Sequence, residues 1–580
     1  MQALEVFQKR LEQAQLYYQK ELARLEDRWA LYSGTHRIDT PTSGVRATAV
    51  RNASLVRNMT FELIETQISS QTPQPRVTPC HPTEHTERNA RAVEAMIEGE
   101  MKRLKFQYLN DEDERLTYVL GGAYYLIEWD GERGRMAVRL LHPRQVLPEP
   151  GVYDPDEMQY IFVRFADSAM QLRQKYGCAL EGLDDEDEVE HTACYFRNAK
   201  GGIGLIRFSG EEILEEYEDY QRRQIRVCAA CGAQMGAGEE KCACGHTKSV
   251  LKAVTEESVP YQMILGDGTV LTTRDERGQE TLLPGCAPDV MPLVVRKNVS
   301  IPFSVLGDSD CDKIRDLQMA YNKLASKVEE KLLKGGSVLT VGWGTRIETT
   351  DEELKVVRVR DAGEKALLGV LNLEVSIAQD LAVLDGYYEQ ARSTLGVTDS
   401  YQGKKDPTAT SGVAKRIAVQ QAAGRLESKR VMKDAAYAQL FRRMFLFMLC
   451  YCDAPKAYVT ASARGTRGEV RFNRYEFLVK QPDGSFKWDL EYLFDTDSSA
   501  SMARDRAAMW AQVQESCAGG AFGDPKELST RLLLWRQLER LNYPNAGFVI
   551  AQMEKEDAHA LQDMQDNHAG TAPDGARLSI

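Results

Sequence analysis

The chain begins with apolar residues spaced three and four positions apart, which is the period of one face of a helix. They predict a long amphipathic helix that ends near Gly34, and they are Leu4, Phe7, Leu11, Ala14, Tyr18, Leu22 and Leu25. A second helical pattern starts at Asn58 and stops at the three prolines of TPQPRVTP, because proline lacks the amide that continues a helix. A third helix is predicted over 86–118.

After residue 118 the pattern changes to that of strands. Two apolar runs in GGAYYLIEWDGERGRMAVRLLHP meet at Asp130 and Gly131, a dipeptide typical of β-hairpins. MQYIFVRFA continues this style, and short strands are expected from 191 to 300. The stretch 181–190 carries seven acidic side chains, so it is expected to be a solvated loop.

Helical spacing returns in DSDCDKIRDLQMAYNKLASKVEEKLLKGG, where Asp308 or Ser309 can cap the start and Gly335 the end. Strands to about 374 and a helix to about 395 are expected next. GVTDSYQGKKDPTATSG has no apolar period and predicts a loop. The longest helical pattern, about forty residues from 411 to 452, follows it. Long helices combined with short antiparallel sheets predict an α+β fold.

Length and composition narrow the class of protein. A chain of 580 residues is too long for one core and suggests three or four structural units. With 43% hydrophobic and 27% charged residues it is a folded globular protein. No export signal is recognised, and the most apolar stretch, MFLFMLCYC at 444–452, is shorter than the about 18 residues that span a bilayer. We therefore expect a protein without a membrane span, whose thiols stay reduced.

Charge bears on nucleic-acid binding in two ways. The net charge of -13 disfavours a protein that grips nucleic acid over its whole surface, because such binding neutralises phosphates with Lys and Arg. The helix from Lys415 to Arg443, however, carries eight basic residues against two acids. Two interpretations stay open for it: contact with DNA, or contact with acidic neighbours and solvent.

Four of the twelve cysteines fall within seventeen positions: Cys228, Cys231, Cys242 and Cys244. A glycine follows each pair, so the backbone can turn and direct amides at the sulfur atoms. This pattern suits tetrahedral Zn²⁺, with His246 as an alternative to Cys244. Free dithiols and a redox switch are the other hypotheses. Four protein ligands leave no open position for substrate, so the zinc would be structural.

Signatures of catalysis are not recognised. The chain has no GxxxxGK[ST] loop, HExxH, GxSxG or dinucleotide glycine fingerprint, and its eight histidines are scattered. We therefore expect a protein that is not an enzyme. Lys404 and Lys405, in the polar loop 397–410, are candidates for contact with phosphates, although two solvated lysines are an equal alternative.

Several segments, taken in order, resemble the portal proteins of tailed bacteriophages. They are LYSGTHRI, NMTFELIETQISSQTPQPRVTP, the hairpin GGAYYLIEWDGERGRMAVRLLHPRQVLPEPG, GDSDCDKIRDLQMAYNKLASKVEEKLLKGG and TSGVAKRIAVQQAAGRLESKR. The resemblance implies a head-to-tail connector: a ring of about a dozen subunits at one capsid vertex, through which a terminase motor packages DNA and from which DNA is ejected. It also implies that the portal itself hydrolyses nothing.

The resemblance also implies a division of the chain into the family's regions. These are an N-terminal wing (1–160), the approach to the stem and the clip with a zinc-ribbon-like insertion of four cysteines at 228–246 (161–307), the stem helix (308–335), wing strands and a helix (336–396), the tunnel loop (397–410), the long wing helix with strands (411–496), the crown (497–560) and a mobile tail (561–580). The cysteine cluster is not part of the family's common pattern.

The partners implied are further copies of the chain, the terminase large subunit, head-tail adaptors, capsid and scaffolding protein, and double-stranded DNA. The locations implied are the virion and, during assembly, the host cytoplasm. Two other classes remain as alternatives. The cysteine cluster and the basic helix are also compatible with a zinc-ribbon nucleic-acid-binding protein, and the cysteines alone with a metalloenzyme.

Overall fold

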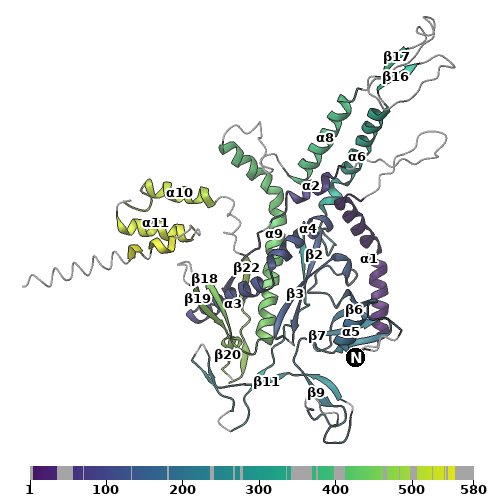
Figure 1. Ribbon diagram of the computed structural model, residues 1–580. Coiled ribbons are helices and arrows are strands. Elements are labelled where there is room, and N and C mark those ends of the chain that lie inside the picture. Colours follow the sequence, from purple (N-terminus) through teal and green to yellow (C-terminus); the bar gives the residue numbers. More distant parts are fainter. Residues whose placement is uncertain are drawn as a thin grey trace, which may run out of the picture.

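The computed structural model describes residues 4–35, 57–340, 369–397, 412–496 and 506–554. Short gaps inside these ranges are 70, 132, 179–181, 236–240, 248, 266–267, 275–277, 335, 374–375, 462–466, 483, 525–526, 541–542, 544–545 and 551. The fold is mixed α+β, with several long helices and many small sheets (Figure 1). All strand pairs within the described ranges are antiparallel, as the sequence predicted.

The helices are α1 (Leu4–Ser33), α2 (Met59–Glu65), α3 (Glu84–Arg103), α4 (Phe106–Leu120), α5 (Ala169–Tyr176), α6 (Asp310–Lys334), α8 (Ala378–Leu395), α9 (Gly412–Tyr451), α10 (Arg506–Ala518) and α11 (Leu528–Arg540). The strands of the first half are β1 (Pro75–Pro79), β2 (Gly122–Asp130), β3 (Arg135–Leu141), β4 (Val146–Pro148), β5 (Tyr160–Ser168), β6 (Glu188–Arg197), β7 (Ile203–Ser209), β8 (Glu212–Tyr217), β9 (Gln224–Cys228), β10 (Ser249–Ala253) and β11 (Glu256–Ser258). The remaining strands are β12 (Met263–Ile264), β13 (Val270–Leu271), β14 (Leu282–Pro284), β15 (Leu293–Lys297), β16 (Gly336–Thr340), β17 (Gly369–Leu373), β18 (Lys456–Ala461), β19 (Arg467–Phe472), β20 (Leu478–Lys480), β21 (Phe486–Trp488) and β22 (Tyr492–Thr496).

Helix boundaries agree with the sequence where local signals are strong. Helix α1 stops before Gly34, whose φ of 75° only glycine adopts readily. The side chain of Ser309 accepts a hydrogen bond from the amide of Cys311 at 3.1 Å and so caps α6, as predicted. The single helix predicted over 86–118 is wrong: α3 and α4 are separate, because Lys105 takes a left-handed conformation with φ 54°.

Two sheets form the centre of the body. The predicted hairpin is confirmed as β2 and β3, and β15 pairs with the other edge of β2. Helix α9 packs across this sheet with its apolar end, where every residue from 444 to 450 is buried. The second sheet has the order β4-β5-β6-β7-β8 and packs against α1 through Phe7 and Ala14. Part of the predicted acidic loop, Glu188 to Glu190, belongs to β6.

Helices α6 and α8 form a two-helix arm that leaves the body. The chain runs out along α6 and back along α8, and β16 pairs with β17 beyond their far end (Figure 1). The two helices pack through a small apolar core of Tyr321, Ala325, Val328 and Leu384, to which Met59 of α2 adds. The sequence had predicted each helix but not that they pair.

Buried ion pairs fasten the base of this arm to the body. Lys429 of α9 pairs with Asp310 in the first turn of α6, and both side chains are almost fully buried. Four residues further along α9, Lys433 lies 3.0 Å from Glu114 of α4. Arg296 of β15 lies 3.5 Å from the same carboxylate. Long helix, arm, sheet and α4 therefore meet in one network of charges.

Asp113 adds a pH-sensitive group to this network. Burial raises the pKa of its carboxyl group to about 6, although Arg296 opposes the shift. In the unfolded chain the pKa of an aspartate is about 3.9. Between about pH 4 and pH 6, Asp113 is therefore protonated more in the native state than in the unfolded chain. Stability from this group therefore increases as the pH falls from about 6 to about 4.

We expect Asp113→Asn to remove this contribution. The free energy of unfolding of the wild type, relative to that of the variant, should increase as the pH falls from 7 to 4.5, because the wild type gains stability when Asp113 is protonated. Urea denaturation at a series of pH values measures it. A difference that stays constant, or that shrinks toward low pH, would contradict the assignment.

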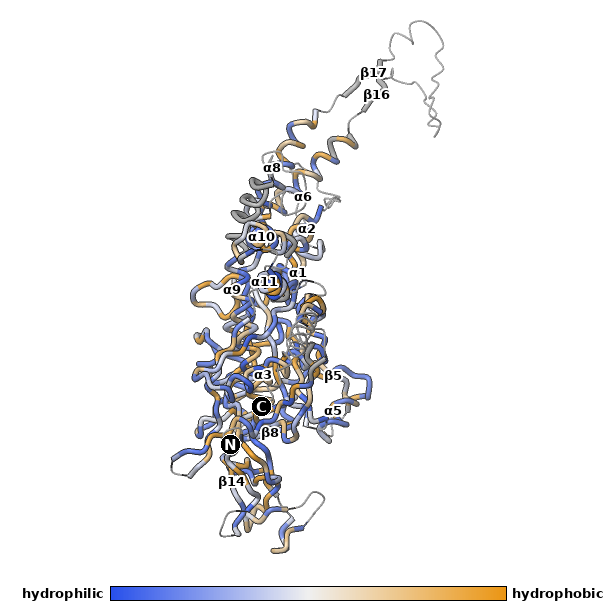
Figure 2. The backbone as a smooth tube through the Cα atoms, turned by 90° about the vertical axis from the view of Figure 1, so that its left-hand side faces the viewer, coloured by the Kyte–Doolittle hydropathy of each residue, from blue (hydrophilic) through white to orange (hydrophobic). Residues whose placement is uncertain are grey.

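At the end of the body opposite the arm lie small hairpins that include β9, β11 and β14 (Figures 1 and 2). β11 and β14 are held to the body because Arg474 pairs with Glu257, and Trp488 donates from Nε1 to the carbonyl of Pro284 at 2.8 Å. Helices α10 and α11 pack on each other, with Trp510 and Trp535 against Tyr543. No helix in the described part of the chain is both long enough and apolar enough to cross a membrane.

Candidate metal centre

The four cysteines predicted as metal ligands lie together at the free end of one hairpin. β9 ends at Cys228 and pairs with β10 in a register that sets Cys228 opposite Ser249. Two tight turns then bring the other sulfur atoms in. The amide of Gly232 donates to the carbonyl of Cys228 at 2.9 Å, and that of Gly245 to Cys242 at 2.8 Å.

Both turns need glycine for the same physical reason. Gly232 has a φ of 71° and Gly245 a φ of 85°, a left-handed conformation in which a side chain would be strained. The chain reverses directly behind each cysteine pair, so both sulfur atoms of a pair point to one side. The glycines noted in the sequence are therefore the residues that shape the site.

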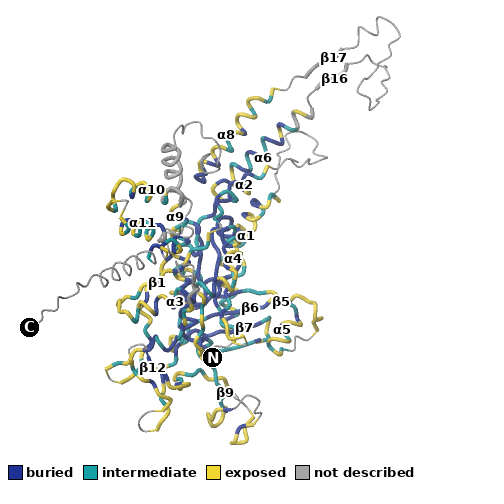
Figure 3. The backbone as a smooth tube through the Cα atoms, turned by 60° about the vertical axis from the view of Figure 1, so that its left-hand side comes forward, coloured by how far each residue is buried: buried dark blue, intermediate teal, exposed yellow. Residues whose placement is uncertain are grey.

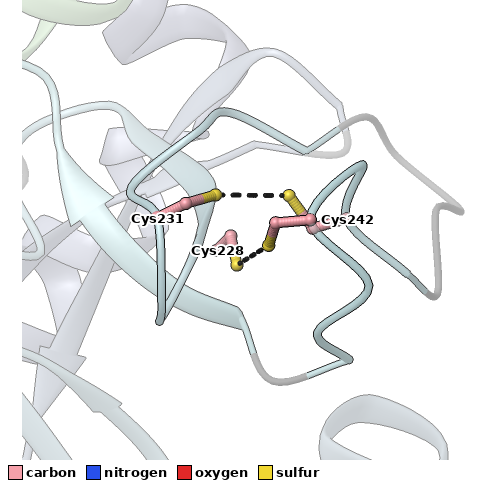
Figure 4. A group of neighbouring side chains, drawn as sticks. Cys228, Cys231 and Cys242 are labelled. Atoms are coloured by element: carbon pink, nitrogen blue, oxygen red, sulfur yellow. Dashed lines mark hydrogen bonds between the residues drawn. The ribbon is translucent and has the colours of Figure 1, made fainter.

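The sulfur atoms turn toward one another (Figure 4). Cys228 Sγ lies 3.4 Å from Cys244 Sγ, and Cys231 Sγ lies 3.5 Å from Cys242 Sγ. All four lie within 4.8 Å of one another. A tetrahedral Zn²⁺ with bonds of about 2.3 Å sets its sulfur ligands about 3.8 Å apart. The donor set and its spacing fit, and the cluster could hold a metal ion such as zinc.

Electrostatics within the cluster favour a bound cation. The amides of Cys231 and Ala230 lower the pKa of Cys228 to about 6, so this thiol ionises readily. At Cys244 the amide of His246 also lowers the pKa, but hydrogen bonds with the three other cysteines outweigh it and raise the pKa to about 12. Without a cation the four sulfur atoms cannot all be thiolates, because like charges at this distance repel.

His246, the predicted alternative ligand, lies at the edge of the site. Its Nδ1 is 3.6 Å from Cys244 Sγ, and it is not a member of the group of four. Cys228 and Cys242 are buried against Met235, whereas Cys231 and Cys244 are exposed. Figure 3 shows that most of the hairpin beyond β9 is exposed, so few apolar contacts support its loops.

The remaining candidates from the sequence were the basic residues that could contact DNA. Lys404 and Lys405 lie outside the described residues. On α9, Lys429, Lys433 and Arg443 are buried and paired with Asp310, Glu114 and Asp156. This part of the basic pattern binds acidic neighbours within the chain, which was one of the two interpretations of the sequence.

A second pair of cysteines was not predicted. Cys286 follows β14 and Cys450 lies near the end of α9, and their buried sulfur atoms are 3.1 Å apart. They are 164 positions apart along the chain, so no local spacing could have indicated the contact. Both are thiols in this structure.

No protein-family model matches the chain, and no curated protein matches it.

Proposed function

We propose that the chain is a portal protein, the head-to-tail connector of a tailed bacteriophage. Identical copies would form a ring of about a dozen at one capsid vertex. A separate terminase motor would package DNA through the central channel, and tail adaptors would dock on the ring. The protein would act in the virion and, during assembly, in the host cytoplasm, and would catalyse no reaction.

One observation carries the proposal: the arm of α6 and α8 is followed in the chain by the long helix α9. A portal needs a stem that leads the channel away from a broad wing, and a long helix to support it. The buried pair of Lys429 with Asp310 joins the base of the arm to α9, and the pair of Lys433 with Glu114 joins α9 to α4. Attachment of this kind suits a part that surrounds moving DNA.

In this proposal, the position of the arm changes which residues are assigned to the stem and to the clip. α6 and α8 together would form the stem, and the clip would include β16 and β17, since they lie at the far end of the arm. The sequence had suggested the clip within 161–307. The cysteine hairpin would then belong to the opposite end of the subunit and not to the surface that meets terminase.

The proposal assigns the cysteine cluster a structural zinc ion. Cys228, Cys231, Cys242 and Cys244 would complete the coordination, so the ion would supply folding energy to a hairpin that lacks a core of its own. No step of DNA transport would involve it.

We expect the purified protein to form rings of about twelve copies. Native mass spectrometry and negative-stain imaging measure the assembly directly. A species that stays monomeric at all concentrations and salt conditions would overturn the proposal.

For the tunnel loop, we expect that replacing both Lys404 and Lys405 with Ala leaves the rings intact and impairs DNA retention. The reason is that paired cations on a polar loop are suited to weak contact with phosphates. Packaging and retention of DNA in assembled particles measure the effect, and wild-type retention in the double variant would contradict the role.

The alternative is a zinc-ribbon protein that binds nucleic acid, and the geometry of the cysteine cluster is the observation in its favour. Tight DNA binding by a monomer or dimer, with affinity that falls steeply as salt increases, would support it over a portal. The internal pairing of Lys429, Lys433 and Arg443 leaves fewer cations for such binding.

A further inference from the structure

Phe303 is an apolar side chain that is exposed to solvent, on a loop that hydrogen bonds hold in place. It is 84% exposed, and Ile301 beside it is also exposed. Its φ of 58° is left-handed, which is costly for a residue with a bulky side chain. Exposure and backbone strain at one residue indicate that this conformation serves a contact outside the described chain.

The loop around Phe303 is anchored on both sides. Asn298 donates from Nδ2 to the carbonyl of Asp308 at 2.9 Å, and the amide of Asp308 donates to Val299 at 2.8 Å. Val305 and Leu306 are buried directly behind the tip. A fixed, exposed aromatic side chain loses little entropy on binding, which is typical of the residues that dominate interfaces.

Phe303 lies near one side, or flank, of α1, to which Tyr153 connects it. Its ring contacts Tyr153, with ring centres 5.9 Å apart. Tyr17 of α1 is next to Tyr153 and raises the pKa of that phenol through a hydrogen bond. Lys20 and Arg24 follow Tyr17 at three and seven positions, and Glu21 follows it at four. Arg24 pairs with Glu21 at 3.7 Å, so the aromatic groups of this flank lie among charges of both signs.

The other flank of α1 borders a groove of about 660 Å³. Leu16, Leu22 and Ala23 contribute its apolar surface, while Glu12 and Glu26 add negative charge. Arg144 lies across from them and pairs with Glu26 at 2.7 Å. Arg164 also lines the groove, so its two cations balance its two acids, and its apolar surface is the part that suits Phe303.

The two flanks face in different directions. Gln19, which lines the groove, and Tyr17 are two positions apart and so point about 160° apart around the helix axis. A projection on one side and a groove on the other cannot meet within one subunit. Between copies they make a heterologous contact, which closes into a ring when each copy is rotated from the last.

We infer that Phe303 of one copy inserts into the groove beside α1 of the next copy. The inference rests on the proposed function, because it names a contact between adjacent subunits of the ring.

A photo-crosslinking amino acid in place of Phe303 tests the contact. Rings are assembled from equal amounts of isotopically heavy and light protein, irradiated and digested. The expected product joins a heavy to a light peptide and contains residues of 12–26 or the peptides of Arg144 and Arg164. Products confined to one chain, to another surface or to a different protein of the particle would overturn the inference.

Substitutions provide a second, independent test. We expect Phe303→Ala and Leu16→Ala each to raise the protein concentration required for assembly by about tenfold or more. The matched control is Tyr108→Ala, since Tyr108 of α4 is 75% exposed and is not among the residues that line the groove. Melting temperatures should not fall, because Phe303 is exposed and its replacement relieves crowding at the left-handed position.

Failure of the inference differs from failure of the proposed function. If wild-type protein forms rings and Phe303→Ala assembles equally well, the contact is wrong and the portal proposal stands. If wild-type protein forms no rings, both are wrong.

Discussion

Glu114→Gln should destabilise the protein by about 3–5 kcal/mol, because it removes the carboxylate shared by two buried cations. Lys433 lies 3.0 Å and Arg296 3.5 Å from Glu114, and the Glu114 side chain is 1% exposed. The glutamine can keep the hydrogen bond from the amide of Ser69, but it cannot balance two charges.

The matched control is an ion pair on the surface. Glu87 and Arg91 of α3 are four positions apart, 3.8 Å from each other and largely exposed. Glu87→Gln should change stability by less than about 1 kcal/mol, because water already solvates both groups. Urea denaturation measures both variants. Equal effects would mean that the buried network does not hold α4, β15 and α9 together.

A consequence for the arm follows from the same network. Asp310 is the carboxylate that joins α6 to α9, and Lys429 also donates to Gln67 at 2.8 Å. Weakening of the Glu114 pairs should therefore loosen the base of the arm before the rest of the body. Hydrogen exchange at the amides of α6 should increase in Glu114→Gln more than exchange in the five-stranded sheet.

Cys231→Ser should abolish metal binding while the body of the protein remains folded. Purified wild-type protein should hold about one zinc ion per chain, and the variant less than about a tenth of that, because a serine hydroxyl is a poor ligand for zinc. Elemental analysis by mass spectrometry measures the content. Residues 224–253 should then exchange amide hydrogens faster, since they have few apolar contacts of their own.

Cys80→Ser is the control for this experiment. Cys80 is also exposed and lies outside the cluster, so its replacement should leave the metal content at about one ion per chain. A Cys231→Ser protein that keeps its metal would show that the ion binds elsewhere. A wild-type protein without metal under reducing, chelator-free conditions would contradict the assignment of zinc.

The cysteine cluster could be predicted from the sequence because its geometry is local. Cys228 and Cys231, and Cys242 and Cys244, are each brought together by a single turn, and the glycine that permits the turn is adjacent in the chain. The break between α3 and α4 is also local, but no glycine or proline marks it. Lys105 adopts a left-handed conformation although nothing in its residue type favours it.

The sequence by itself determined the α+β class, the hairpin of β2 and β3, the N-terminal cap of α6 and the four-cysteine site, since each depends on residues close in the chain. Only the tertiary structure decided that α6 pairs with α8 and that Lys429, Lys433 and Arg443 of α9 are buried. Lys429 lies 119 positions from Asp310, and the apolar period of a helix says nothing about which distant acid will meet it. The physical reason is that a buried charge needs a partner, and partners are set by packing rather than by local spacing.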